Sequence, residues 1–187
     1  VLEAKDGEIG RCKDFLFDDE KWTVRYMVAD TGKWIPDKRV LVSPISLGEP
    51  RWESKRLPVR LTRDQVKRAP SLRWDQPVSR QHEADFALYY GYPYYWVGNS
   101  LWGPAATPKQ LEEWVQEEKL NVTVDDGGDP NLRSVEEVAG YAIVALNGEV
   151  GHVEEFILDD ENWAVRYMVV DTRNWLPGRK VLISPRW

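Results

Sequence analysis

The chain contains a duplicated segment, and this repeat constrains its fold more than any other feature of the sequence. Residues 7–44 and 148–185 align at a constant offset of 141 without a gap, and about 21 of the 38 aligned pairs are identical. Both methionines, Met27 and Met168, occupy equivalent positions. The equivalent tryptophans are Trp22 with Trp163 and Trp34 with Trp175. Because a repeat of this length builds one structural unit twice, we predict two similar units within the 187 residues.

Each copy is predicted to consist of short antiparallel strands. Residues 22–28 and 163–169 alternate so that Trp, Val, Tyr and Val share one face, which is the period of a half-buried strand. An apolar run precedes each of them, at 15–17 and 156–158, and an Asp-Asp turn between the runs predicts a hairpin. A further strand is expected at 40–44, where the proline ends the strand or places it at an edge of the sheet. About five or six such strands per copy hide their edges best by closing into a barrel.

These elements, in this order, resemble the PRC-barrel family. The order is Asp-Gly-Glu-Ile-Gly, an apolar strand, an Asp-Asp turn, a Trp-x-Val-Arg-Tyr-x-Val strand and Val-Leu-Val-Ser-Pro. The central strings Leu-Thr-Arg-Asp-Gln-Val-Lys-Arg-Ala-Pro and Tyr-Tyr-Gly-Tyr-Pro-Tyr-Tyr-Trp also resemble segments that follow the barrel in stand-alone bacterial members. The resemblance implies a mainly β protein with two small antiparallel barrels, joined by an irregular, partly helical connector. The expected boundaries are 1–61 for the first barrel, 62–130 for the connector and 131–187 for the second barrel.

The resemblance also implies a function. The family takes its name from the cytoplasmic domain of the photosynthetic reaction-centre H subunit, and it includes the C-terminal domain of a ribosomal small-subunit maturation factor. We therefore expect a non-catalytic protein-binding or scaffolding module. The alternatives are a photosynthetic accessory protein that influences electron transfer, or a ribosome- or RNA-associated maturation-type factor. No stretch approaches the roughly 18 to 20 apolar residues that span a bilayer, so a cytoplasmic protein without a transmembrane segment is expected.

The central segment between the repeats, residues 51–133, differs from them in composition. Thr62 and Gln65 form a Thr-x-x-Gln capping box, which predicts a short helix from residue 63 to 68. Residues 51–80 hold nine basic and three acidic side chains, although the whole chain has a net charge of −6. These basic side chains either pair with acidic turns of the barrels or bind an acidic partner surface. The acidic isoelectric point of about 5.1 argues against a nucleic-acid partner.

An aromatic run in the connector is the second unusual feature. Residues 89–96 hold five of the eight tyrosines. Tyrosine and tryptophan are enriched where one surface meets another, so the run is either an arm packed on the barrels or a protein interface, including that of a homodimer. Base stacking is a third, weaker alternative. The candidate partner-binding residues are Tyr92, Tyr94, Tyr95, Trp96, Arg56, Arg60 and Arg63.

Catalytic, metal and cofactor sites are not expected. Cys12 is the only cysteine, which excludes an internal disulfide and a cysteine-cluster zinc site. The sequence has no Gly-rich phosphate loop, no Gly-x-Ser-x-Gly elbow and no His-Glu-x-x-His helix. The acidic runs 18–20 and 159–161 are interpreted as solvated turns, because three consecutive carboxylates in a hairpin turn cannot converge on one cation.

One arginine interrupts the alternating strand of each copy. Arg25 and Arg166 are equivalent in the repeat. We expect each to pair across the strands with a carboxylate such as Asp30 or Asp171, and a role as a partner anchor is the alternative.

Overall fold

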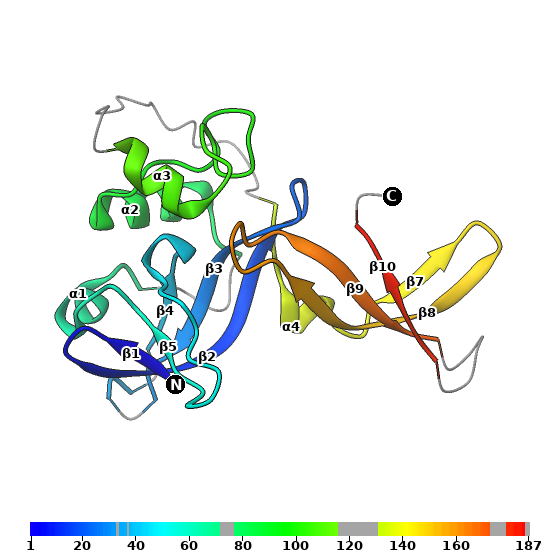
Figure 1. Cartoon of the computed structure of the whole chain (residues 1–187), viewed down its shortest axis with the longest axis horizontal. Helices are drawn as coiled ribbons and strands as arrows, with labels where there is room; N and C mark the ends of the chain where they lie inside the picture. Colours follow the sequence, from blue (N-terminus) through cyan, green and yellow to red (C-terminus); the bar gives the residue numbers. More distant parts are fainter. Residues whose placement is uncertain (33, 37, 72–76, 116–130, 173–178, 186–187) are drawn as a thin grey trace.

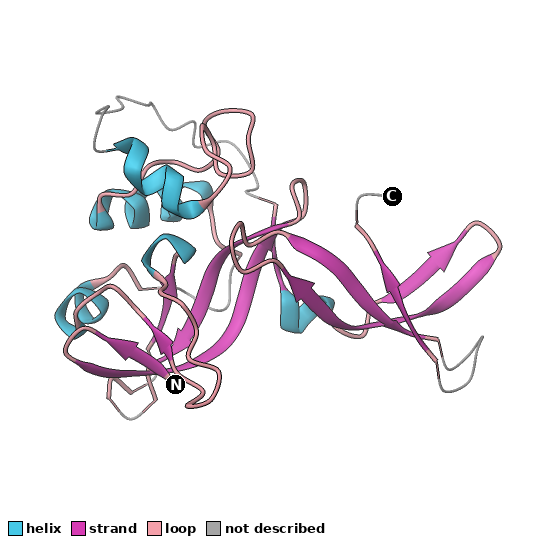
Figure 2. Cartoon of the chain, viewed as in Figure 1, coloured by secondary structure: helices cyan, strands magenta, loops and turns pink. Residues whose placement is uncertain are grey.

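The computed structural model describes residues 1–32, 34–36, 38–71, 77–115, 131–172 and 179–185. Strands dominate the described residues and form two sheets, so the predicted mainly β class is confirmed (Figure 2).

The first sheet has six strands and the second has four. The first runs in the order β4-β3-β2-β1-β5, and β6 also pairs with β2. The second runs in the order β10-β9-β8-β7. The strands of the first sheet are β1 (Leu2–Ala4), β2 (Gly7–Asp18), β3 (Thr23–Asp30), β4 (Arg39–Val42), β5 (Leu57–Pro58) and β6 (Leu132–Ser134). Those of the second sheet are β7 (Ala142–Ala145), β8 (Gly148–Leu158), β9 (Val165–Asp171) and β10 (Lys180–Ile183).

The two copies of the repeat form the same strand registers. Phe15 lies opposite Met27 in the first sheet, and Phe156 lies opposite Met168 in the second. Gly10 and Gly151 also correspond, and a Cβ atom at either one would lie 2.0 Å from the backbone oxygen of the aspartate that ends the facing strand. This close approach explains the glycine in both copies.

Neither sheet closes on itself within the described residues. Strands β4 and β5 end the pairing path of the first sheet, and β10 and β7 end that of the second. The two-barrel architecture therefore stays a prediction. Strand β6 lies in the segment expected to belong to the second barrel, yet it pairs with β2, with Ser134 opposite Leu16.

Four α-helices and one 3-10 helix are described. The α-helices are α1 (Arg63–Arg68), α2 (Arg80–Tyr90), α3 (Pro108–Val115) and α4 (Val135–Val138), and the 3-10 helix η1 covers Pro44–Ser46. The predicted capping box at the start of α1 is confirmed, because the backbone amide of Thr62 donates to the Gln65 side chain at 2.8 Å and the Gln65 amide donates to the Thr62 hydroxyl at 3.2 Å.

The connector packs on the first sheet and completes its core. Helices α2 and α3 gather over that sheet, whereas β7 and β8 extend away from them (Figure 1). Tyr26 of β3 meets Phe86 of α2 edge-on, with ring centroids 5.2 Å apart, and Tyr95 at 6.4 Å. Trp102 and Leu111 of the connector are buried in the same cluster. The first sheet is therefore apolar on both faces, and the connector covers one of them.

The two copies meet where their equivalent strands begin. The amide of Val24 donates to the carbonyl of Trp163 at 2.9 Å, and the amide of Val165 donates to the carbonyl of Trp22 at 2.7 Å. The repeat offset exchanges one of these bonds for the other, so the contact has local two-fold character. Both tryptophans have positive φ angles, 50° for Trp22 and 61° for Trp163, which turn each chain into the shared ladder.

The tryptophan side chains are exchanged between the two cores. Trp163 packs against the core of the first sheet, with its ring centroid 6.1 Å from that of Phe15. Trp22 packs against the core of the second sheet, which contains Met168 and Val170, and it also stacks on Phe17 of its own copy, with ring centroids 5.3 Å apart. Each copy therefore supplies part of the core of the other.

This exchange predicts that each tryptophan stabilises the opposite unit. We expect Trp163→Ala to lower the free energy of unfolding by about 2–3 kcal/mol, somewhat less than for a fully buried tryptophan because the ring is half-buried. Amide hydrogen exchange is expected to accelerate in β2 and β3 for Trp163→Ala, and in β8 and β9 for Trp22→Ala. The exposed Trp52 gives the control, since Trp52→Ala removes no core contact. Acceleration confined to the strands of the mutated copy would contradict the exchange.

Candidate functional site

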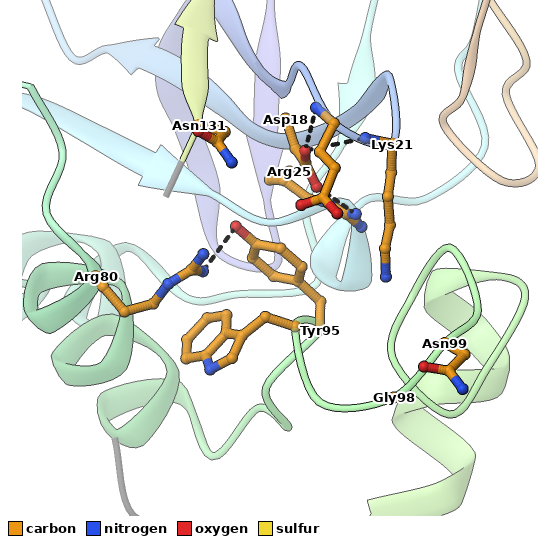
Figure 3. A pocket seen from close by; sticks show the side chains of 10 residues that line it. Asp18, Lys21, Arg25, Arg80, Tyr95, Gly98, Asn99 and Asn131 are labelled. Atoms are coloured by element: carbon orange, nitrogen blue, oxygen red, sulfur yellow. Dashed lines mark hydrogen bonds and ion pairs between the residues drawn. The ribbon is translucent and has the colours of Figure 1, made fainter. Parts of the chain in front are cut away.

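A polar pocket of about 340 Å³ lies beside the turn between β2 and β3 (Figure 3). Its walls come from that turn, from the first residue of α2, from the loop that follows Tyr95 and from Asn131. The pocket therefore lies where the first sheet, the connector and the segment leading into the second copy come together.

Arg25 is the most buried charge in the pocket wall. Its guanidinium donates to Asp18 Oδ2 at 2.9 Å and to the backbone oxygen of Leu101 at 2.6 Å. The guanidinium carbon also lies 4.1 Å from the ring centroid of Tyr95 and 5.0 Å from that of Trp102. Arg25 thus fastens the connector to the sheet by charge, hydrogen bond and cation–π contact.

The partner of Arg25 differs from the expected one. Asp18 ends β2 before the acidic turn, whereas Asp30 lies opposite Arg11. The interpretation of Asp18 as part of a solvated turn is wrong as well, because its side chain is buried. The reason is tertiary: the connector loop excludes water from both charges, and a buried arginine needs a neutralising carboxylate.

A second buried carboxylate lies behind the pocket. Glu83 of α2 is fully buried and accepts a hydrogen bond from the Tyr95 hydroxyl at 2.6 Å and from Arg80 at 2.8 Å. Burial raises the pKa of Glu83 to about 7, against the lowering influence of Tyr95 and Arg80. The Arg80 guanidinium lies 4.4 Å from the ring centroid of Trp96. The guanidinium groups of two ion pairs, Arg25 with Asp18 and Arg80 with Glu83, thus both lie near the ring of Tyr95.

The polar groups of the pocket wall hold parts of the fold together. Lys21 Nζ donates to the backbone oxygen of Ser100 at 2.8 Å, so this cation also ties the turn to the connector. Among the described residues, no group of three or more histidine, cysteine, aspartate or glutamate side chains is arranged to hold a metal ion.

The structure divides the predicted aromatic residues between the core and its rim. Tyr95 is buried, and with Trp96 it lines the pocket. Tyr92 is half-buried, stacks on Tyr90 at 5.3 Å and hydrogen bonds to Ser46. Tyr94 is half-buried and stacks on Trp96 at 4.7 Å. The run is an arm packed on the first sheet, and Tyr95 is not a surface residue.

The predicted arginines have partners within the chain. Arg56 pairs with Glu3 at 3.2 Å, and Arg60 pairs with Glu112 at 2.7 Å. Arg63 lies 4.7 Å from the ring centroid of Trp34. These residues are absent from the pocket wall, so the structure does not bring the seven predicted residues together at one site.

Sequence reasoning missed an open apolar face on the second sheet. Three side chains that the connector covers in the first copy are exposed at the equivalent positions of the second, whereas Val169, the equivalent of Val28, is buried on its own sheet, with 8% exposed. The equivalent exposed fractions are 8% for Leu16 against 42% for Ile157, 3% for Tyr26 against 43% for Tyr167, and 1% for Leu41 against 57% for Leu182. The available signal was that the strands are repeated whereas the aromatic connector occurs once.

The open face ends at an exposed copy of the buried ion pair. Arg166 Nε donates to Asp159 Oδ2 at 3.0 Å, and a second nitrogen of the same guanidinium also donates to that oxygen. This hydrogen bond holds the pKa of Asp159 below its ordinary value. Asp159, not Asp171, is therefore the carboxylate that binds Arg166, as Asp18 binds Arg25.

Comparison with known proteins adds no assignment. The sequence matches no protein-family model, and no curated protein matches it. Within the described parts of the chain, no helix is long and apolar enough to cross a membrane.

The two equivalent ion pairs make a matched stability test. We expect Arg25→Met to lower the free energy of unfolding by about 3–5 kcal/mol, because it leaves Asp18 buried without its partner. Arg166→Met should cost about 0–1 kcal/mol, because water solvates both groups of that pair. Urea unfolding of both variants measures the difference. Similar losses for the two variants would contradict the fastening role of Arg25.

Because of Glu83, we expect the free energy of unfolding to fall as the pH rises. The unfolded carboxyl loses its proton near its ordinary pKa of 4.5, whereas the folded one keeps it to about 7. The contribution is therefore fully present below about pH 4.5 and is lost as the pH rises through 7. Relative to Glu83→Gln, which stays neutral, the wild-type chain should lose up to about 3 kcal/mol across this window. Urea unfolding between pH 4.5 and 8 measures it, with the exposed Glu53→Gln as control. If the free energy of unfolding of Glu83→Gln falls with pH as steeply as that of the wild-type chain, Glu83 is not the source of this pH dependence.

Proposed function

We propose that the chain is a non-catalytic protein-binding or scaffolding module of the PRC-barrel type, and that its second sheet carries the partner surface. One observation carries the proposal: Ile157, Tyr167 and Leu182 are exposed on a face whose duplicate is covered. Exposed apolar side chains that cluster on one face favour an interaction site over plain surface. The nearby Arg166 adds a charged group, which helps to fix the orientation of a partner on this face.

The architecture of the first copy supports the family type. After β4 the chain returns through η1, and Leu47 forms a bridge with Val59, next to β5. Strand β5 in turn pairs with β1, and β1 with β2. The bridge thus links the segments that follow β4 and β5, the two strands at the ends of the pairing path, and such a link favours a small barrel.

The basic side chains of residues 51–80 do not favour a nucleic-acid partner over a protein. Arg56 and Arg60 are held by Glu3 and Glu112, so these cations already have carboxylate partners. Nucleic-acid phosphates would have to displace these carboxylates before they could bind the arginines. The second sheet offers apolar side chains instead, which suit a protein segment.

Capture experiments with one surface variant test the proposal. We expect the immobilised chain to retain a protein from an extract of its source cells, and Tyr167→Glu to reduce that retention more than about tenfold, because burying a new carboxylate in an apolar contact is costly. Tyr141 is another exposed tyrosine of the second copy, and Tyr141→Glu is the matched control. Equal retention by both variants, or retention that neither variant changes, would contradict a partner surface on the second sheet.

A further inference from the structure

The first copy shows which chemistry covers this kind of sheet face. The covering segment begins with α2, whose Phe86 meets Tyr26 edge-on at 5.2 Å. The loop after α2 then places Tyr95 and Trp102 over the same face, and Leu111 of α3 completes the cover. A short helix followed by an aromatic loop therefore matches a face built of one tyrosine and several aliphatic side chains.

The arginine at the edge of the face adds a polar requirement. Arg25 receives three things from the covering segment: the backbone oxygen of Leu101 at 2.6 Å, and the rings of Tyr95 and Trp102 within 5.0 Å. Arg166 has the equivalent carboxylate, Asp159, while its side chain stays 47% exposed. The second face thus repeats the arginine and the aspartate that the sheet contributes to this contact, and it exposes them to solvent.

We propose that the open face of the second sheet binds a protein segment with the chemistry of residues 80–111 of this chain. That segment is a short helix followed by an aromatic loop, with a backbone carbonyl that accepts from Arg166 and a ring that stacks on its guanidinium. The inference rests on the proposed function, because it names the partner class of the same surface.

A second copy of the chain fits the face less well than such a segment. The segment 80–111 of each copy already covers the first sheet of its own chain, where Phe86 and Tyr95 are buried. Pairing of two open faces would bring sheet against sheet. Backbone carbonyls of a sheet lie in its ladders, along the sheet plane, so they cannot reach an arginine on the face of the partner as the Leu101 carbonyl reaches Arg25.

A graft on the full chain tests the inference. Ser184 and Pro185 are the equivalents of Ser43 and Pro44, so residues 45–115 can be appended after Pro185 with the connection that they have in the first copy. Hydroxyl-radical labelling with mass spectrometry then measures the exposure of Tyr167. Tyr26, the buried equivalent in the same molecule, is the internal reference. We expect the labelling of Tyr167 to fall to the level of Tyr26.

A matched control graft separates recognition from crowding. It carries Phe86→Ser, Tyr95→Ser and Trp102→Ser in the appended copy alone, and it should leave Tyr167 labelled as in the parent chain. Unchanged labelling of Tyr26 in every grafted variant would show that the first unit stays folded. Combining Arg166→Met with the intact graft should restore part of the Tyr167 labelling.

Three results would overturn the inference. The first is full labelling of Tyr167 in the intact graft, and the second is equal protection by the control graft. The third is a dimer of the ungrafted chain in sedimentation, with Tyr167 protected as the dimer forms, which would make a second copy the occupant. Docking of the graft without Tyr167-dependent capture from extract would refute the proposed function alone. Capture without docking would refute the segment chemistry alone.

Discussion

The ion pair between Arg25 and Asp18 joins the parts on which the rest of the structure depends. Both charges are removed from water, and such a pair is tolerated only with good geometry and further hydrogen bonds. The connector supplies these through the Leu101 carbonyl and the flanking rings. The same loop covers Tyr26, so the polar anchor and the apolar cover form together. The alternating pattern predicts a half-buried strand, yet β3 is buried on both faces, and its arginine becomes a core residue by this route.

The same side chains have different environments in the two copies, and the difference lies outside the repeat. Arg25 and Arg166 each bind the aspartate that ends the preceding run, yet the first pair is buried and the second is exposed. Burial therefore depends on which segment lies over the sheet. A duplicated sheet with one connector leaves one of two equivalent faces open, and that asymmetry is the basis of the functional proposal.

Local patterns predicted the elements of the structure well, because strand alternation and capping act over a few residues. The 141-residue offset predicted equivalent strands, and the registers of Phe15 and Phe156 agree with it. The burial of Tyr95 and the partner of Arg25 could not be predicted in this way, because both depend on an irregular loop with no periodicity to read. The open face could have been predicted, since the sequence repeats Tyr26 as Tyr167 but does not repeat the aromatic run.

The exchanged tryptophans connect the open face to the covered one. Trp163 packs against the core of the first sheet, and the backbone oxygen of the preceding residue, Asn162, accepts a hydrogen bond from the Trp102 indole at 2.8 Å. Trp102 in turn lies beside Arg25, while Asp159, near the start of the same turn, holds Arg166. The turn 159–163 therefore touches the connector on one side and the open face on the other.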